Sequence, residues 1–340
     1  MTNSNDGVMF IAEVSANHLG SLERARELVI QAAKAGATAV KFQTYTADTM
    51  TLNLPKLSVT AEHELWGGRT LYSLYEEAHT PWDWHEELFA LARELGVLPF
   101  SSPFDLSAVK FLESLNAPMY KIASLETGDH LLIRAVAETG KPVIVSTGAT
   151  ELEEIDELVQ VVRETGNKDL TLLLCTSSYP AVPADSHLRR ISLLRETFGC
   201  EVGLSDHTLG IGVSVAAIAL GATAIEKHIT LRRTDGGADS AFSMEPEEFA
   251  ELVNQGNYAK DSLGRPEWRI QDSEMESRRL RRSLYITQDV KAGDIVTELN
   301  VRAIRPGDGA KPKFLPEVIG KKFNGDFTIG TPLSLDYISG

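Results

Sequence analysis

The segment PVIVSTGATELEEIDELVQVVRETGNKDLTLLLCTSSY (142–179) contains one complete strand–helix–strand unit. Its two ends, 142–148 and 170–179, begin with nearly continuous apolar residues and turn polar where they stop. Strands that are buried on both faces have this pattern. Residues 151–166, between them, have the apolar spacing of a helix. The segment therefore predicts two parallel strands joined by a helix.

The same unit repeats along the chain. Further strand candidates of this kind occupy 8–15, 39–45, 98–104, 119–124, 201–207 and 223–231. Helical patterns separate or follow them at 21–36, 80–96, 106–115, 129–139, 186–198, 212–221 and 245–263. Eight strands, each followed by a helix, predict a (β/α)8 TIM barrel. The alternative is a doubly wound open sheet, which usually has fewer strands.

The chain is longer than one barrel requires. It has 340 residues, of which 43% are hydrophobic, and a barrel typically takes about 250. After 264 the pattern changes to a polar stretch and then to short strands and turns. We predict a barrel domain over 1–264, a linker over 265–282 and a small β-rich domain over 283–340. Residues 46–79 form one long insertion after the second strand, where functional loops often occur.

Charge and composition exclude several classes of protein. The net charge is -15, which argues against binding nucleic acid or an anionic membrane surface. Residues 278–340 hold 11 Lys/Arg against 7 Asp/Glu, so this tail carries +4 and the rest carries -19. The two cysteines form no disulfide framework, and MTNSNDGVMF lacks the features of a signal peptide. We therefore expect a cytoplasmic protein with no membrane partner.

Polar side chains gather where the predicted strands end. In a barrel, the carboxyl ends of the strands meet at one rim, and this rim holds the active site. The residues at these ends are Glu13, Asn17, His18, Lys41, Gln43, Ser101, Ser102, Lys121, Ser124, Ser146, Thr147, Ser177, Tyr179, Ser205, Asp206, His207, Glu226, Lys227 and His228. Each serine taken singly is more often a helix cap than a ligand.

Two lysines in this set indicate an anion pocket. Lys41 and Lys121 each follow an apolar strand start, where a lysine must be paired or functional. Together with several hydroxyls they supply the charge and the donors that a phosphate needs.

Two histidines indicate a metal site. His207 and His228 end adjacent strands, so their imidazoles can converge. Two imidazoles with a carboxylate and waters suit a divalent ion such as Mn²⁺. Asp206, Glu226 and Asp239 are possible outer groups of that site. The alternative is a pair of structural histidines. Glu13 can serve as a general acid or base, or simply as an ion-pair partner of a lysine.

Taken together, these residues resemble the sialic acid synthase family. The matching segments are IAEVSANHLGS (11–21), AVKFQTYTADT (39–49), FSSPFD (100–105), YKIAS (120–124), VSTGAT (145–150), CTSSYP (175–180), GLSDHTLG (203–210), IEKHITL (225–231) and GGADSAFSMEPEEF (236–249). NVRAIRPGDG (300–309) resembles the antifreeze-like (SAF) domain of this family. The match spans almost the whole chain in order. TYTADTMTL, WGGRTLY and HTPWDWH resemble its pseudaminic acid synthase branch.

The resemblance implies a role for each matching position. Glu13, His207 and His228 would be catalytic, and the two histidines would hold the metal, with Mn²⁺ expected and Mg²⁺ or Co²⁺ possible. The residues implied to bind phosphoenolpyruvate (PEP) are Lys41, Ser102, Lys121, Ser124, Ser146, Ser177 and Ser205. Ser177 stands where the family has Asn, and Ser102 replaces a Thr. The residues implied to contact the sugar are Gln43, Tyr179, Asp239 and Arg305, the last from the SAF domain of the other chain in a domain-swapped homodimer.

The implied reaction condenses PEP with an amino-sugar aldose. For the pseudaminic branch the sugar is 2,4-diacetamido-2,4,6-trideoxy-L-altrose. The nearest alternative keeps the chemistry and uses the sugar of an N-acetylneuraminate or legionaminate synthase. A metallohydrolase on the same barrel would leave both lysines unexplained. A carbohydrate-binding or ice-binding protein without enzymatic activity, suggested by the tail alone, would leave the whole rim unexplained.

Overall fold

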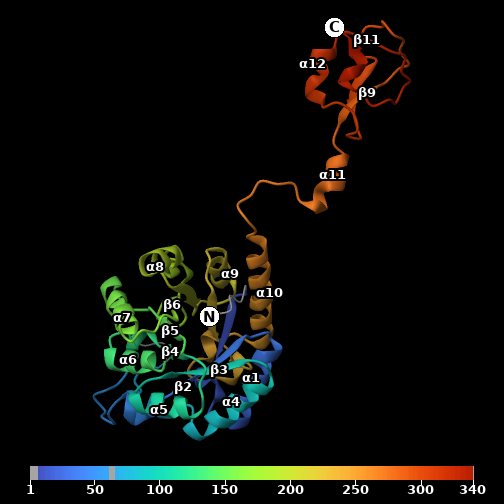
Figure 1. Cartoon of the computed structure of the whole chain (residues 1–340). Coiled ribbons are helices and arrows are strands. Elements are labelled where there is room, and N and C mark those ends of the chain that lie inside the picture. Colours follow the sequence, from blue (N-terminus) through green and yellow to red (C-terminus); the bar gives the residue numbers. More distant parts are fainter. Residues whose placement is uncertain (1–6, 61–65, 340) are drawn as a thin grey trace. The chain divides into compact units, whose positions relative to one another are not determined.

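The chain folds into two compact units, divided after Gly264. The computed structural model describes residues 7–60 and 66–339. The first unit contains the strands and helices from β1 to α10, and the second contains those from α11 to the end of the chain (Figure 1). Each unit has its own apolar core, so each is described by itself.

The first unit is a closed barrel of eight parallel strands, each hydrogen-bonded to the next in chain order. The barrel closes where β1 pairs with β8, with Glu13 opposite His228, while Glu13 also lies opposite Lys41 on β2. The predicted barrel is confirmed, and the open sheet is excluded. Its strands are β1 (Met9–Glu13), β2 (Ala39–Thr44), β3 (Leu98–Pro103), β4 (Tyr120–Ile122), β5 (Val143–Ser146), β6 (Leu170–Cys175), β7 (Glu201–Ser205) and β8 (Ala224–His228).

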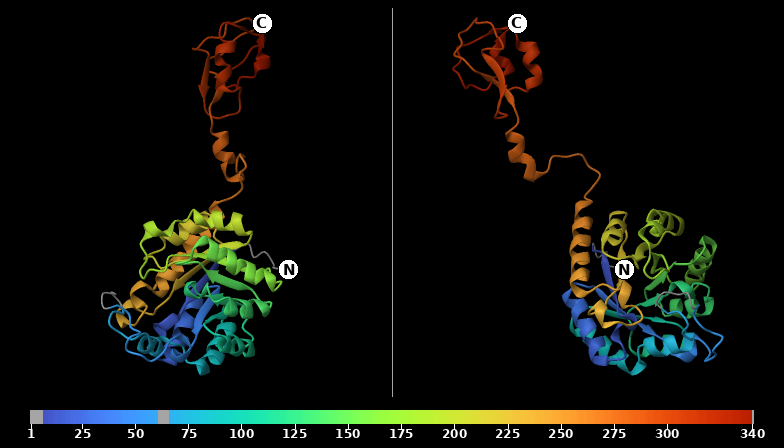
Figure 2. Two further views of the ribbon diagram at one scale, coloured as in Figure 1. Left: turned by 90° about the vertical axis from the view of Figure 1, so that its left-hand side faces the viewer. Right: turned by 180° about the vertical axis from the view of Figure 1, so that it is seen from behind.

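Helices surround the barrel strands on the outside (Figure 2). Side-chain caps mark several of their starts, as at Ser21, whose hydroxyl accepts a hydrogen bond from the backbone N–H of Arg24. The helices of this layer are α1 (Leu22–Lys34), α4 (His85–Glu94), α5 (Leu106–Ser114), α6 (His130–Glu138), α7 (Leu152–Glu164), α8 (Arg190–Phe198), α9 (Gly212–Ala219) and α10 (Pro246–Ser262). The helix expected from Thr80 instead begins at His85, after a 3-10 turn over Trp82–Trp84.

Alternate residues of each strand belong to two different cores. Those that point outward pack with the helices, as Phe10 and Val40 do. Those that point inward form a small apolar plug consisting of Ile11, Ala39, Phe100, Met119, Ile144, Leu173 and Ala224. Both faces of every strand are therefore buried, which explains why the strands begin as continuous apolar runs.

The long insertion after β2 contains two short helices, α2 (Ala47–Met50) and α3 (Leu71–Ala78). Residues 61–65 of it lie outside the described residues. An antiparallel bridge between Ser58 and Thr70 joins the segment that precedes residues 61–65 to the segment that follows them. Among residues 7–60 and 66–339, no helix combines the length and apolar character needed to cross a bilayer.

The second unit is small and rich in strands. Its core contains residues such as Leu284, Val301 and Phe323. The strands pair antiparallel in two sheets, β9 with β10 and β11 with β12. The elements are α11 (Met275–Arg279), β9 (Ser283–Ile286), β10 (Val301–Ile304), α12 (Leu315–Val318), β11 (Lys322–Phe323) and β12 (Ile338–Ser339).

Candidate active site

A polar layer lies directly above the apolar plug inside the barrel. Seven of its residues lie two positions after a plug residue, and Ser205 on β7 lies two positions after Gly203, because side chains on the same face of a strand recur with period two. Its members are Glu13, Lys41, Ser102, Lys121, Ser146, Cys175, Ser205 and Glu226. All except the partly buried Cys175 are buried.

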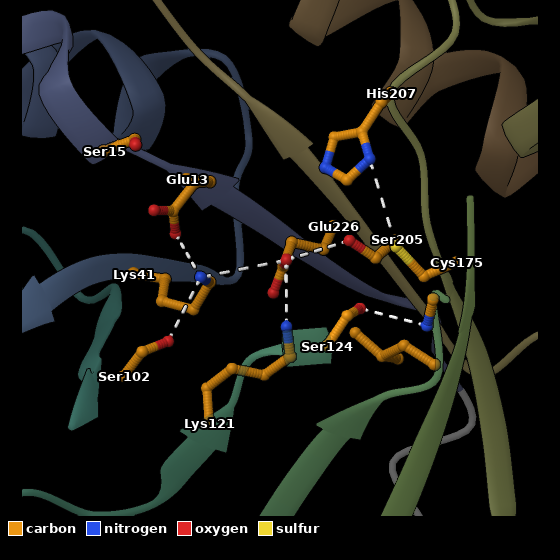
Figure 3. Close-up of polar contacts among 12 residues, drawn as sticks. Glu13, Ser15, Lys41, Ser102, Lys121, Ser124, Cys175, Ser205, His207 and Glu226 are labelled. Carbon is orange, nitrogen blue, oxygen red and sulfur yellow. Dashed lines mark hydrogen bonds and ion pairs between the residues drawn. The ribbon is translucent and has the colours of Figure 1, made fainter. Parts of the chain in front are cut away.

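Ion pairs connect this layer across the barrel (Figure 3). Lys41 Nζ lies 2.6 Å from Glu13 Oε2, and Lys121 Nζ lies 3.1 Å from Glu226 Oε1. Lys41 Nζ also approaches Glu226 Oε1, at 3.8 Å, and donates a hydrogen bond to Ser102 Oγ at 3.4 Å. Ser205 Oγ donates to the same Glu226 oxygen at 3.1 Å. The two lysines therefore share one carboxylate and point into one space.

The pKa values of the two carboxyl groups move in opposite directions. Burial raises the pKa of Glu13, and this effect outweighs the opposing attraction of Lys41. Burial would also raise the pKa of Glu226, but Lys121 and Lys41 together lower it to about 2. Burial lowers the pKa of Lys121, whereas Glu13 and Glu226 overcome burial and raise that of Lys41. Glu226 is thus the permanent anion, and Glu13 is the carboxyl group suited to proton transfer.

Gly148 opens a small cradle beside this layer. A Cβ at this position would lie 2.2 Å from Ser177 Oγ, 2.9 Å from Ser124 Oγ and 3.1 Å from Cys175 Sγ. The backbone N–H of Gly148 donates to Ser124 Oγ at 3.0 Å. Ser146 Oγ, two residues earlier, is buried without a hydrogen-bond partner among the described residues. Small hydroxyl groups and a bare backbone are suited to an anionic group placed against them.

His207 and His228 face each other next to the polar layer, with ring centroids 5.4 Å apart. His207 Nδ1 donates to the carbonyl of Thr176 at 3.1 Å, which leaves Nε2 as the free acceptor. Burial, together with the nearby His207, lowers the pKa of His228 well below its ordinary value, and its Nδ1 has no hydrogen-bond partner within the described residues. A neutral imidazole with an orphaned buried nitrogen fits a metal ligand.

The two histidines supply only part of a coordination sphere. In the described part of the chain, no group of three or more His, Cys, Asp or Glu side chains is arranged to hold a metal by itself. Further ligands would be substrate or water oxygens. Cys175 Sγ lies 3.9 Å from His207 Nδ1. Burial alone would raise the pKa of Cys175 and lower that of His207, but their mutual interaction reverses both shifts.

A second group of polar residues lines the side of the mouth near β1 and β8. Gln43 Nε2 donates to Glu13 Oε1 at 2.9 Å and to Ser15 Oγ at 3.0 Å. Ser15 Oγ donates to Asp239 Oδ2, which lies 3.9 Å from His228 Nδ1. Burial raises the pKa of Asp239 despite this hydrogen bond. The Tyr179 ring packs 4.4 Å from His207.

The structure brings together the predicted site residues of the first unit, and Arg305 is an exposed residue of the second unit. Asp206, considered above as an outer group of the metal site, instead faces the helix layer. Its Oδ2 lies 3.1 Å from Lys227 Nζ and accepts from Ser214 Oγ at 2.6 Å. Lys227 Nζ also donates to the carbonyl of Thr208. This pair holds the turn that carries His207.

Sequence reasoning gave no site role to several groups at the mouth. Ser15 and Cys175 were absent from the predicted site, and Glu226 was only a possible outer group. Period two groups Cys175 and Glu226 with the plug residues of β6 and β8, but only the structure shows which residues form that plug. Glu126 follows β4, in a 3-10 turn (Ser124–Glu126), and its buried Oε2 has no hydrogen-bond partner among the described residues. Burial raises the pKa of Glu126 to about 7.

Comparison with known proteins identifies the family to which this chain belongs. The family model described as the NeuB family matches residues 28–267, and the model of the SAF domain matches residues 281–338. A pseudaminic acid synthase from Campylobacter jejuni subsp. jejuni is 43% identical over 97% of this chain and 96% of its own length. An N,N'-diacetyllegionaminic acid synthase from Legionella pneumophila is 34% identical, over 96% of this chain and 94% of its own.

Solved structures show the same relationship. The crystal structure of an N-acetylneuraminic acid synthetase from Leptospira borgpetersenii, in complex with citrate, superposes with a TM-score of 0.72 at 31% identity. The superposition covers 80% of this chain and 90% of the Leptospira chain. The resemblance noted in the sequence is confirmed: the chain belongs to the NeuB family, and its second unit contains a SAF domain.

Proposed function

We propose that this protein is a pseudaminic acid synthase. In the reaction, C3 of PEP forms a bond to the aldehyde carbon of 2,4-diacetamido-2,4,6-trideoxy-L-altrose. Water adds at C2, and phosphate leaves as its bond to C2 breaks. The observation that supports this most strongly is the buried polar layer, in which Lys41 and Lys121 converge on one space. Higher identity to a pseudaminic than to a legionaminic acid synthase favours this branch.

PEP carries its negative charge on a phosphate and a carboxylate, and the polar layer offers matching donors. Lys41 and Lys121 would supply the positive charge, which is worth more in a water-excluded interior than in solution. The hydroxyl groups proposed to complete the binding site are those of Ser102, Ser124, Ser146, Ser177 and Ser205. Ser146 is suited to this because its hydroxyl is buried without a hydrogen-bond partner among the described residues. Gly148 is suited to it because its bare backbone lies against the hydroxyl groups of Ser124 and Ser177.

The sugar would enter on the side of Gln43, Tyr179 and Asp239. Glu13 would lie between the two substrates, because it contacts Lys41 on one side and Gln43 on the other. Its raised pKa suits a group that gives a proton to the developing sugar alkoxide or takes one from the attacking water.

We further propose that His207 and His228 hold a divalent ion, with Mn²⁺ expected and Mg²⁺ or Co²⁺ as alternatives. When bound, such an ion would polarise the sugar aldehyde and orient water. Because imidazole binds metal in its neutral form, affinity for the ion should fall at low pH.

One assay tests the proposed function. The purified protein is incubated with PEP, Mn²⁺ and one sugar at a time, and phosphate release is followed. We expect turnover with the trideoxy altrose sugar to exceed turnover with N-acetylmannosamine and with the legionaminate precursor sugar. Equal or better use of N-acetylmannosamine would assign the protein to the neuraminate branch. An absence of PEP-dependent turnover with every sugar would contradict the proposal.

We also propose a domain-swapped homodimer in which Arg305 of one chain reaches the sugar site of the other. The opposite charges of the tail and the rest of the chain support this. Apolar side chains of the segment 265–282 are exposed, Trp268 and Leu280 among them, and a partner chain would cover them. Because both cysteines are free and PEP is made inside cells, we place the enzyme in the cytoplasm.

Subunit exchange tests the shared site. Homodimers of Glu13→Ala should be inactive, and those of Arg305→Ala should be severely weakened. In a mixed dimer with a shared site, one site receives both defects and the other receives neither. Roughly a quarter of wild-type activity should then return on statistical exchange. No gain in activity, with exchange verified by mass, would contradict the shared site.

A further inference from the structure

Trp66 connects the long insertion after β2 to the loops that follow β6 and β8. Its indole Nε1 donates a hydrogen bond to the carbonyl of Ala238 at 3.1 Å. Its ring packs against Tyr179, with centroids 5.9 Å apart. Ala238 precedes Asp239, and Tyr179 follows β6, so the indole contacts two segments that were expected to hold the sugar.

The contact with Tyr179 extends a row of aromatic rings that begins at the histidines. Tyr179 lies 4.4 Å from His207 and 5.1 Å from Phe242, measured between ring centroids. Phe242 in turn lies 5.0 Å from His228. The row therefore runs from the two histidines at its inner end to Trp66 at its outer end.

This order would determine which part of a bound sugar meets which ring. The aldehyde carbon must lie near the histidines and the polar layer, because the new bond to PEP forms there. An open-chain sugar that extends along the aromatic row then carries its last carbon toward Trp66. The indole Nε1 of Trp66 already donates to Ala238, so the remaining ring atoms that such a carbon could meet are apolar.

We propose that Trp66 makes the enzyme selective for sugars whose terminal carbon is a methyl group. This inference rests on the proposed function and identifies a specificity residue for it. A methyl group gains contact with the indole face. A hydroxymethyl group would lose hydration there without gaining a partner, which disfavours it.

The test compares two sugars that differ at one atom. One is 2,4-diacetamido-2,4,6-trideoxy-L-altrose, and the other is its analogue with a hydroxyl at C6. The selectivity is the ratio of their kcat/KM values at saturating PEP and Mn²⁺. The wild-type enzyme should prefer the deoxy sugar by about 10-fold or more.

Three substitutions separate the apolar face from the hydrogen bond. Trp66→Ala removes both and should lower the selectivity about 10-fold. Trp66→Phe keeps an aromatic face and loses only the N–H donor, so it should retain most of the selectivity. Should Trp66→Ala fail to fold, Trp66→Leu keeps apolar volume without the broad ring and should show an intermediate ratio. The KM for PEP should stay constant in all of them.

Trp82→Ala is the matched control for Trp66→Ala. Trp82 also donates its indole N–H to a backbone carbonyl, that of Tyr45, but it stacks on Phe111 away from the aromatic row. The control variant should show the same ratio of kcat/KM values for the two sugars as the wild-type enzyme. An unchanged ratio in Trp66→Ala, or an equal loss with both sugars, would overturn the inference while leaving the proposed function intact. A wild-type enzyme inactive with both sugars would contradict the proposed function itself.

Discussion

Lys121 on β4 and Glu226 on β8 form an ion pair across the interior of the barrel, with Nζ and Oε1 3.1 Å apart. Their strands are as far apart in the closed strand order as two of the eight can be. Lys41 approaches the same oxygen from β2. One carboxylate therefore holds two ammonium groups close together, while Lys41 also pairs with Glu13.

Lys121→Met should weaken binding of PEP far more than binding of the sugar. Removing one partner of a desolvated charge pair costs about 2–5 kcal/mol, so the KM for PEP should rise at least 30-fold. Lys227→Met is the control, since Lys227 is equally buried but pairs with Asp206 on the helix side. It should reduce the free energy of unfolding by about 3–5 kcal/mol and leave the KM for PEP nearly unchanged. Similar values of this KM in both variants would contradict the anion pocket.

His207→Ala and His228→Ala should each abolish binding of Mn²⁺. Titration followed by the electron paramagnetic resonance signal of free Mn²⁺ measures this without an activity assay. His85→Gln is a suitable control, because His85 is also buried but bonds to Thr44 outside the barrel interior. Unaltered Mn²⁺ binding in both alanine variants would show that Mn²⁺ binds elsewhere. Chelation should also stop turnover, and added Mn²⁺ should restore it.

Gly148→Ala should impair PEP binding without much loss of stability. The new methyl group would displace the hydroxyl groups of Ser177 and Ser124, which are ends of side chains that can rotate away. The cradle would then be filled, and the KM for PEP should rise about 10-fold or more. Gly128→Ala places a methyl in open space and should change neither property. A KM for PEP within twofold of the wild type in Gly148→Ala would rule out this cradle as part of the site.

Glu126→Gln should stabilise the barrel at high pH but not at low pH. Burial raises the pKa of Glu126 from 4.5 to about 7, so the folded state binds this proton more tightly than the unfolded state does. The wild type therefore loses stability as pH rises from about 4.5 through 7, and the glutamine variant does not share that loss. The difference in unfolding free energy should change by about 3 kcal/mol between pH 4 and pH 8. Urea unfolding at both values measures it, and a pH-independent difference would refute the assignment.

The sequence alone determined the barrel and most of its rim. Apolar runs followed by polar ends, eight times over with helices between, leave few other folds. The lysines at 41 and 121 were recognisable because an unpaired lysine is costly in a buried strand. Arg305, by contrast, belongs to a separate unit, and its place at the site stays a prediction.

Only the tertiary structure decided which residues face the inside of the barrel. Period two divides Ser205, Asp206, Glu226 and Lys227 into two sets, but both faces of a barrel strand are buried, so hydrophobicity does not say which set points inward. Closure of the barrel turns Ser205 and Glu226 toward the lysines and pairs Asp206 with Lys227 outside. The contact between Trp66 and Tyr179 is likewise invisible in sequence, because it joins loops that only the closed barrel brings to one mouth.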